Sequence, residues 1–459
     1  MSRAALSLKD AAAEIRAGRI SSAELVADCL KRIDEVDPDI EAWAFLDRDH
    51  AMRQAEAADD HRRQGKATGP LHGVPVGIKD IFDTGDMPTE FGSPFWAGRM
   101  PRKDAAAVSR LRAAGAVIMG KTVTTEYAYF HPGKTKNPHD KTRTPGGSSS
   151  GSAAAVAAHM VPGAIGSQTN GSVIRPASFC GVVGFKPTHG LIPRSGALML
   201  SRTLDHVGVF ARSVEDAALL AEVLAGFDEE DPDTHPLAHP PFAAVAESEP
   251  PLPPRFAFVR SAVWGRAEPI TIEAFAELVE TLGEPASEVE LGSAFECAVD
   301  YQRIVMDVEM AHNLHRDYEK AGDKLSAALR KLIERGRNYP AVDYLRATSA
   351  IAPLNATLEE VFNEYDAILT PAAPGPAPAI DTTGDPVFCS TWTYLGTPAV
   401  TLPLLSSEGG LPIGVQLIGR RGNDARLLRT ARWLVKTLQR GGQRRPAKER
   451  AAPRSANKG

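Results

Sequence analysis

Short apolar runs alternate with longer, amphipathic and often Ala-rich segments over most of the chain. The apolar runs have the length and composition of β-strands and lie at 74–78, 116–119, 163–166, 182–185, 256–259, 367–370, 399–402 and 414–418. Helix-like segments separate them, at 21–33, 51–63, 104–114, 152–159, much of 268–366 and 424–438. Strands that alternate with helices over such a length are typical of the α/β class.

The chain of 459 residues is long enough for two domains, but its organisation favours one. Neither an internal repeat nor a linker divides the alternating pattern. The Pro-rich, acidic stretch 226–254 has the composition of a long surface excursion. We therefore predict one large domain over residues 1–440. A disordered basic tail is predicted over 441–459, where Gly, Pro and Arg show no apolar periodicity.

The overall composition argues against several classes of protein. The formal net charge is −5, whereas nucleic-acid-binding proteins normally present a strongly basic face. The first residues lack the apolar core of a secretion signal, and no stretch approaches the ~20 apolar residues of a membrane span. Cys29, Cys180, Cys297 and Cys389 are scattered without a CxxC pair, which argues against a disulfide framework or a zinc site. These features predict a cytoplasmic protein that binds neither nucleic acid nor membrane.

Residues 115–122 match the phosphate-binding pattern GxxxxGK[ST] letter for letter. In a phosphate-binding loop these residues follow a strand and curl so that their backbone N–H groups converge. Here the central residues are Ala-Val-Ile-Met, which are themselves strand-like. We therefore expect Lys121 near the end of a strand, and no nucleotide site.

Residues 147–151 match GxSxG, the nucleophile turn of α/β-hydrolases. That turn directly follows an apolar strand and needs a catalytic histidine, which usually lies late in the chain. The preceding residues, Lys-Thr-Arg-Thr-Pro, are not strand-like, and all 12 histidines lie at or before His315. The pattern therefore disfavours an α/β-hydrolase.

A better candidate nucleophile is Ser172, at the end of the Gly-containing sequence Gln-Thr-Asn-Gly-Ser. A serine nucleophile needs a base within reach and hydrogen-bond donors for the developing oxyanion. If this turn exposes its backbone, the N–H groups of Thr169, Asn170, Gly171 and Ser172 can form an oxyanion hole. No histidine near Ser172 has a motif-like setting, so the sequence gives little support to a histidine-based triad.

Lys79 offers a different kind of base. It ends the apolar run 74–78, and burial disfavours the charged form of a lysine. A neutral amine near pH 7 is therefore physically reachable, and it can accept a proton.

At these segments the sequence resembles the amidase signature family. Residues 73–80 match its Gly-Val-Pro-x-x-x-Lys-Asp motif, and residues 146–152 match Gly-Gly-Ser-Ser-Gly-Gly-Ser with Ser150 in place of a glycine. Further matches are a Gly-Ser pair at 171–172, Phe-Cys-Gly at 179–181, Gly-Phe-Lys-Pro-Thr at 184–188 and Leu-Pro-Ile-Gly-Val-Gln at 411–416. The resemblance covers about residues 5–440, nearly the whole chain.

The resemblance implies a mixed central β-sheet covered by helices on both sides, and a Ser-Ser-Lys relay. By position, Ser172 is the nucleophile, Ser148 the bridging serine and Lys79 the base, with a cis peptide bond before Ser148. The implied reaction hydrolyses a carboxamide carbon–nitrogen bond through an acyl-enzyme and needs no metal or cofactor. The implied partner is a small-molecule amide, and a homodimer is left open.

The chain departs from the commonest family pattern around the nucleophile. Gln168 replaces the usual aspartate, and Arg175 lies one position later than the usual arginine. This form resembles the malonamidase subgroup, in which that arginine holds the carboxylate of a small acid amide such as malonamate. Arg175 lies one helical turn past Ser172 if a helix starts there, and a guanidinium binds a carboxylate well. An internal salt bridge of Arg175 is the alternative. For the whole chain, the alternative is an amidotransferase A-type subunit that acts with partner subunits.

Overall fold

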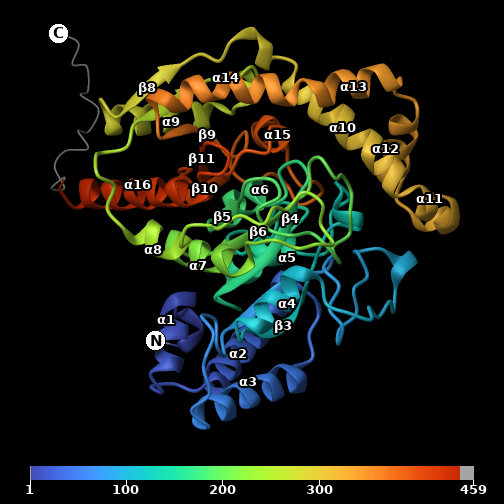
Figure 1. Cartoon of the computed structure of the whole chain (residues 1–459), viewed down its shortest axis with the longest axis vertical. Helices are drawn as coiled ribbons and strands as arrows, with labels where there is room; N and C mark the ends of the chain where they lie inside the picture. Colours follow the sequence, from blue (N-terminus) through green and yellow to red (C-terminus); the bar gives the residue numbers. More distant parts are fainter. Residues whose placement is uncertain (1, 445–459) are drawn as a thin grey trace, which may run out of the picture.

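The computed structural model describes residues 2–444 and shows a mixed sheet through the centre of the molecule (Figure 1). Within this range, eleven strands lie in the order β1-β3-β2-β4-β6-β5-β10-β11-β9-β7-β8. β2 is parallel to β3 and β4, and β7 is parallel to β8 and β9, whereas the other neighbouring pairs are antiparallel. The strands are β1 (Trp43–Phe45), β2 (Pro75–Lys79), β3 (Val117–Thr122), β4 (Gly163–Gln168), β5 (Val183–Lys186), β6 (His206–Ala211), β7 (Phe256–Val259), β8 (Ala286–Val289), β9 (Ala367–Pro371), β10 (Ala399–Ser406) and β11 (Pro412–Ile418). The predicted α/β class with a mixed sheet is confirmed.

Helices cover both faces of this sheet. Gly163 and Gly166 of β4 face opposite ways, because side-chain directions alternate along a strand. A Cβ atom on Gly163 would lie 2.8 Å from Leu8 of α1 and 3.3 Å from Leu220 of α7, whereas one on Gly166 would lie 2.6 Å from the Oγ of Ser149, just before α5. The helices are α1 (Leu8–Arg16), α2 (Ser22–Ile40), α3 (Arg48–Arg63), α4 (Ala106–Ala113), α5 (Ser150–Ala157), α6 (Ile174–Cys180), α7 (Val214–Leu224), α8 (Phe242–Glu247), α9 (Pro269–Leu282), α10 (Ala298–Asn313), α11 (His315–Ala321), α12 (Ala327–Arg337), α13 (Ala341–Ser349), α14 (Ile351–Glu364), α15 (Val387–Tyr394) and α16 (Asp424–Arg444).

Two helices, α2 and α16, begin within one residue of their predicted positions but continue past their predicted ends. Ser21 and Glu24 form a capping box at the start of α2, but α2 continues past the predicted end at residue 33 to Ile40. α16 runs past residue 438 to Arg444, so it enters the segment 441–459 that is predicted to be a disordered tail. Once a helix is nucleated, each further residue adds a hydrogen bond, so a helix can outlast its apolar pattern. Residues 445–459 of that segment lie outside the described residues.

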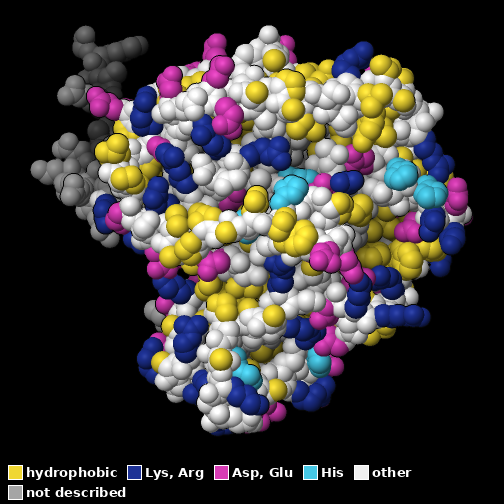
Figure 2. Space-filling model, viewed as in Figure 1, with side chains coloured by type: hydrophobic (Ala, Val, Ile, Leu, Met, Phe, Trp, Pro, Cys, Tyr) yellow, Lys and Arg dark blue, Asp and Glu magenta, His cyan; other side chains and the backbone are white. Residues whose placement is uncertain are grey.

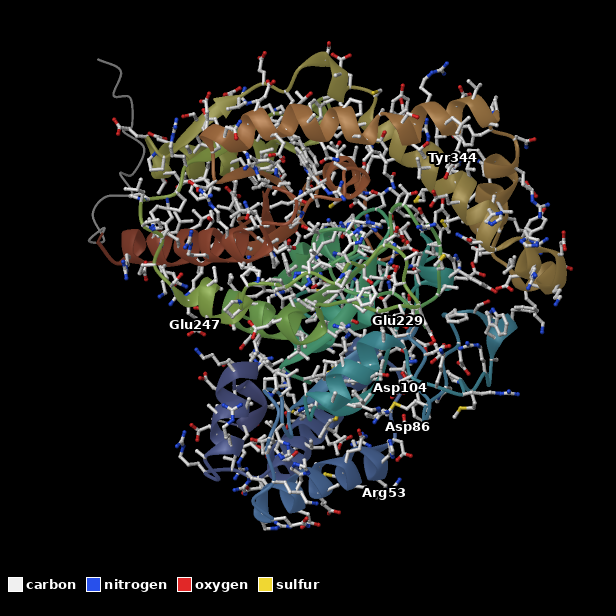
Figure 3. The ribbon with its side chains drawn as sticks, viewed as in Figure 1. Arg53, Asp86, Asp104, Glu229, Glu247 and Tyr344 are labelled. Atoms are coloured by element: carbon white, nitrogen blue, oxygen red, sulfur yellow. The ribbon has the colours of Figure 1, made fainter. Side chains whose placement is uncertain are left out.

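The face shown in Figure 2 carries charged side chains of both signs, mixed over its area. Ion pairs join segments on this surface. Figure 3 labels Asp86 and Asp104, and Arg112 of α4 binds both, at 2.6 and 2.9 Å. The ion pair between Arg112 and Asp86 holds the segment that follows β2 against α4. From residue 2 to residue 444, no helix is both long enough and apolar enough to cross a membrane.

α5 packs so closely on its neighbours that Gly151 has no room for a side chain. A Cβ atom there would lie 2.2 Å from the carbonyl oxygen of Ala42 and 2.3 Å from the backbone nitrogen of Val123. Both atoms belong to the backbone, so we expect Gly151→Ala to lower the free energy of unfolding by about 3 kcal/mol. Urea denaturation checks this against Gly265→Ala, whose Cβ would meet no atom within 4 Å. Equal stability of the two variants would contradict the close packing.

Candidate active site

β2 and β4 lie side by side, and their ends bring three polar side chains together. Lys79, the last residue of β2, is fully buried. Its Nζ donates a hydrogen bond to Ser148 Oγ at 2.6 Å and lies 2.8 Å from Ser167 Oγ of β4. Ser148 follows a cis peptide bond, as the resemblance implies, and leads into α5. The fold thus brings two of the predicted residues, Lys79 and Ser148, into direct contact.

Ser167 is a partner of Lys79 that sequence reasoning missed. It lies on β4, which pairs in parallel with β2 so that Ile78 is opposite Ile165. The available signal was a serine in a strand of small and apolar residues, just before the Ser172 turn. That signal points to Lys79 only when the two strands are known to be neighbours.

The surroundings of Lys79 favour its uncharged form. Burial lowers the pKa of Lys79 well below its ordinary value of 10.5, because an ammonium group loses its hydration inside the protein. The negative charge of Asp205 acts in the opposite direction, with a smaller effect on the pKa. A neutral amine beside a serine hydroxyl has the protonation state that a base requires.

Ser172 ends a turn, residues 169–172, that connects β4 to α6. Its side chain is nearly buried, with 8% of the residue exposed. Within residues 2–444, the four backbone N–H groups of this turn donate no hydrogen bond to the protein. Three of its four carbonyl groups are occupied, since those of Thr169, Asn170 and Gly171 accept hydrogen bonds from Gln302, Thr393 and Arg175 respectively. Successive N–H groups without an acceptor suit the binding of an oxyanion.

Gln168 and Thr169 hold this turn in place. Gln168 Oε1 accepts hydrogen bonds from the N–H groups of Val173 at 2.8 Å and Ile174 at 3.0 Å. These groups open α6, where an aspartate carboxylate would also be a suitable acceptor. Thr169 Oγ1 donates to Asp205 Oδ1 at 2.6 Å. Gln168, which replaces the usual aspartate, therefore still provides an acceptor for the start of α6.

Ser148 and Ser172 line the same small pocket. Its volume is about 20 Å³, room for about one water molecule. Thr169, Asn170 and Arg175 also line it, whereas Gly171 does not. The other walls come from Ala128, Tyr129, Phe130, Leu200, Met306 and Met310. The fold therefore gathers both serines, two further residues of the turn and Arg175 around one space.

Arg175 of α6 is 2% exposed and forms no ion pair with any acidic group of the described chain. Its Nε donates to the carbonyl oxygen of Thr383 and its Nη2 to that of Gly147, both at 2.7 Å. Its Nη1 is buried and has no hydrogen-bond partner. Burial lowers the pKa of Arg175 to about 10. The internal salt bridge is thus not formed, and a ligand with an acceptor group would satisfy Nη1.

The two other motif matches have structural settings, as expected. Residues 117–122 form strand β3, in which buried Lys121 pairs with Asp80 at 3.2 Å. Ser149, the serine of the GxSxG match, precedes α5 without a strand directly before it. Its Oγ contacts the backbone of Ser167. Within residues 2–444, no group of three or more His, Cys, Asp or Glu side chains could hold a metal ion.

Comparisons with known proteins cover nearly the whole chain. The family model described as Amidase matches residues 24–428. The chain is 34% identical to the A-type subunit of the glutamyl-tRNA(Gln) amidotransferase of Chloroflexus aggregans, over 92% of this chain and 94% of that protein. It resembles the native peptide amidase of Stenotrophomonas maltophilia with a TM-score of 0.82 and 30% identity, over 95% and 97% of the two chains. A structure described as a vestigial protein complex that reveals the origins of an s-triazine catabolic enzyme matches with a TM-score of 0.88 and 31% identity, over 94% and 98%.

Proposed function

The chain belongs to the amidase family, and we propose that it hydrolyses carboxamides through a relay of Ser172, Ser148 and Lys79. The observation that carries this proposal is the distance of 2.6 Å between Lys79 Nζ and Ser148 Oγ. Ser148 lines the pocket, and this contact joins it to a base, because the amine of Lys79 is buried and its pKa is lowered. Ser167, at 2.8 Å, holds the same amine from β4.

In the proposed reaction, Ser172 Oγ attacks the amide carbonyl carbon and passes its proton to Ser148, which gives its own proton to Lys79. The N–H groups of the turn 169–172 bind the oxyanion of the tetrahedral intermediate. The carbon–nitrogen bond then breaks as the proton returns through Ser148 to the leaving nitrogen. Ammonia or an amine departs, and an acyl-enzyme remains on Ser172. Water attacks this ester through the same relay and releases the carboxylic acid.

We further propose a small acid amide such as malonamate as the substrate. Arg175 lines the same pocket as Ser148 and Ser172, and its unpaired Nη1 is the kind of donor that a substrate carboxylate would bind. This assignment corresponds to the malonamidase subgroup. In this view, residues 1–440 are the catalytic unit, which acts in the cytoplasm. A homodimer stays a prediction that size-exclusion chromatography can check.

The substrate proposal is tested by comparing malonamate with malonamide, its uncharged analogue. Arg175 also binds the carbonyl oxygens of Gly147 and Thr383, so Arg175→Ala is expected to slow the hydrolysis of both. We expect kcat/KM for malonamate to fall about 10²-fold further than that for malonamide, because a buried charge loses its partner. Ammonia release measures both reactions. An equal loss on the two substrates would contradict the carboxylate contact and leave the amidase relay untouched.

A second candidate function is that of an amidotransferase A-type subunit that acts with partner subunits. The 34% identity to the A-type subunit of a glutamyl-tRNA(Gln) amidotransferase supports it. The purified chain alone separates the two candidates. Ammonia release from a free amide by this chain supports the amidase, whereas turnover only after partner subunits are added would favour the amidotransferase.

A further inference from the structure

A much larger cavity lies next to the reaction pocket. Its volume is about 750 Å³, within the range of about 300–1,000 Å³ that is usual for small-molecule sites. Its walls come from the segment 189–203, α10, α13, the start of α14, and the end of α15 with the turn that follows, and Asp233 and Arg421 complete them. None of Lys79, Ser148, Ser172 and Arg175 lines it, so it is separate from the proposed reaction site.

Two elements form walls of both spaces. On α10, Met306 and Met310 line the reaction pocket, whereas Val308 and His312 line the large cavity. In the segment 199–205, Leu200 lines the reaction pocket and its neighbour Met199 lines the cavity. A ligand that moves either element from the cavity side therefore also moves a wall of the reaction pocket.

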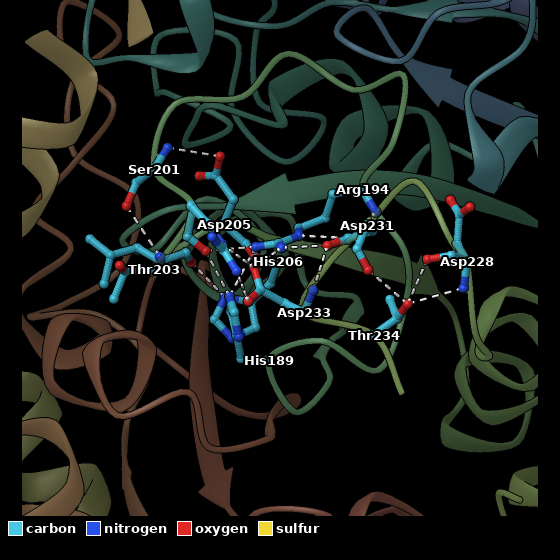
Figure 4. A network of polar contacts seen from close by, with 12 residues as sticks. His189, Arg194, Ser201, Thr203, Asp205, His206, Asp228, Asp231, Asp233 and Thr234 are labelled. Atoms are coloured by element: carbon cyan, nitrogen blue, oxygen red, sulfur yellow. Dashed lines mark hydrogen bonds and ion pairs between the residues drawn. The ribbon is translucent and has the colours of Figure 1, made fainter. Parts of the chain in front are cut away.

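Hydrogen bonds join the wall of the cavity to the turn that holds Ser172. Glu309 of α10 accepts hydrogen bonds from the Thr203 N–H at 3.0 Å and from the hydroxyl of Tyr344 at 2.8 Å, and Figure 3 labels Tyr344 on α13. The segment then continues to Asp205, whose carboxylate accepts from the N–H groups of Leu200 and Ser201 and from Thr169 Oγ1. Figure 4 shows Thr203 and Asp205 within one network of polar contacts.

Of the two arginines that line the cavity, Arg202 pairs with Asp233, whereas Arg421 has no acidic partner in the described part of the chain. Arg421 is exposed at the cavity, and a Cβ atom on Gly396 would lie 3.7 Å from its Cζ. No acidic group of the described chain lies within ion-pair distance of Arg421, and partial burial lowers its pKa. The acidic residues of the cavity are already bound: Asp233 pairs with Arg194 and Arg202, and Glu309 with the donors above. An incoming anion would therefore find its best position at Arg421.

We propose that this cavity is a second ligand site, which takes a small organic carboxylate with an apolar body and thereby alters amide turnover. The carboxylate binds Arg421, and the apolar body lies against Met199, Val308, Ile351 and Leu395. The binding part of this proposal is independent of the proposed function, whereas the effect on turnover rests on it.

Phenylacetate is a suitable probe, and isothermal titration calorimetry of the full chain measures its binding without turnover. We expect phenylacetate to bind the wild type saturably and to bind Arg421→Gln at least tenfold more weakly. The uncharged analogue 2-phenylethanol should bind the wild type at least tenfold more weakly than phenylacetate does. The matched control is Arg420→Gln, since Arg420 pairs with Glu359 outside the cavity and its loss should change the affinity less than twofold. Saturating phenylacetate should change kcat/KM for an amide at least threefold in the wild type, but not in Arg421→Gln.

Four results would overturn the proposal. Phenylacetate could fail to bind, or bind equally well to Arg421→Gln. Its binding could be lost in Arg175→Ala and kept in Arg421→Gln, which would put the probe in the reaction pocket. Inorganic phosphate could bind as tightly as phenylacetate, which would remove the role of the apolar wall. If the chain hydrolyses no amide at all, calorimetry still tests the site, so failure of the proposed function is distinguishable.

Discussion

Ser172→Ala is expected to abolish amide hydrolysis. Alanine has no nucleophilic oxygen, and neither Ser148 nor Lys79 lies at the end of the turn 169–172, whose N–H groups have no acceptor in the protein. Loss of a nucleophile that works within a relay lowers kcat by about 10⁴- to 10⁶-fold in comparable serine enzymes. Ammonia release at saturating amide measures the loss. Mass spectrometry of quenched wild-type enzyme should find the acyl group on the peptide that contains Ser172.

Ser150→Ala is the matched control for this variant. Ser150 is a buried serine whose Oγ donates to the carbonyl oxygen of Val123 at 3.3 Å, and it does not line the reaction pocket. Its replacement removes one weak hydrogen bond, so turnover per folded molecule should persist. If Ser172→Ala kept as much turnover as Ser150→Ala, Ser172 would not be the nucleophile.

The sequence made the main candidates visible because each of them lies where one element ends or the next begins. Lys79 ends β2, Ser148 precedes α5, and Ser172 lies just before α6. Local patterns of apolar, Gly and Ser residues mark such junctions, and the family motifs add their order. The α/β class was predictable for the same reason, since periodicity is a local property of the chain.

The residues that support the site were not predictable, because their contacts depend on strand order and helix packing. Ser167 is 88 residues from Lys79, and Gln302 is 133 residues from the carbonyl of Thr169 that it binds. Asp205 reaches Thr169 only because β6 pairs with β4. β6 itself, His206–Ala211, was missing from the predicted strands, since its Gly and Ala residues weaken the strand signal.

Lys79→Met is expected to remove most of the activity and to make the protein more stable. Methionine keeps much of the length of lysine but cannot accept a proton, so the hydroxyl of Ser148 loses its base. We expect kcat to fall by orders of magnitude, as happens when the base of a serine relay is removed. The gain in stability has a separate cause, which is that burial opposes the charged form of Lys79.

The pH dependence of that stability has a definite sign. The unfolded chain holds a proton on Lys79 up to its ordinary pKa of 10.5, whereas the folded chain releases this proton at a lower pH. Between the two pKa values the unfolded state binds more protons, so the stability of the wild type rises with pH. Lys79→Met has no titratable group at this position, so its stability lacks this contribution to the pH dependence. Its stability advantage over the wild type should therefore be largest at low pH and shrink as the pH approaches 10.5.

Lys121→Met is the control for this comparison, and we expect it to make the protein less stable. Lys121 is also a buried lysine, on the neighbouring strand β3, but it pairs with buried Asp80 at 3.2 Å. Its loss leaves that buried carboxylate with the N–H of Glu90 but without its cationic partner, and should lower the free energy of unfolding by about 3–5 kcal/mol. Thermal unfolding between pH 6 and about pH 10, with ammonia release on the same samples, measures both variants. If Lys79→Met were destabilised as much as Lys121→Met, or kept the turnover of the wild type, Lys79 would not be a neutral base. It would then be a structural cation.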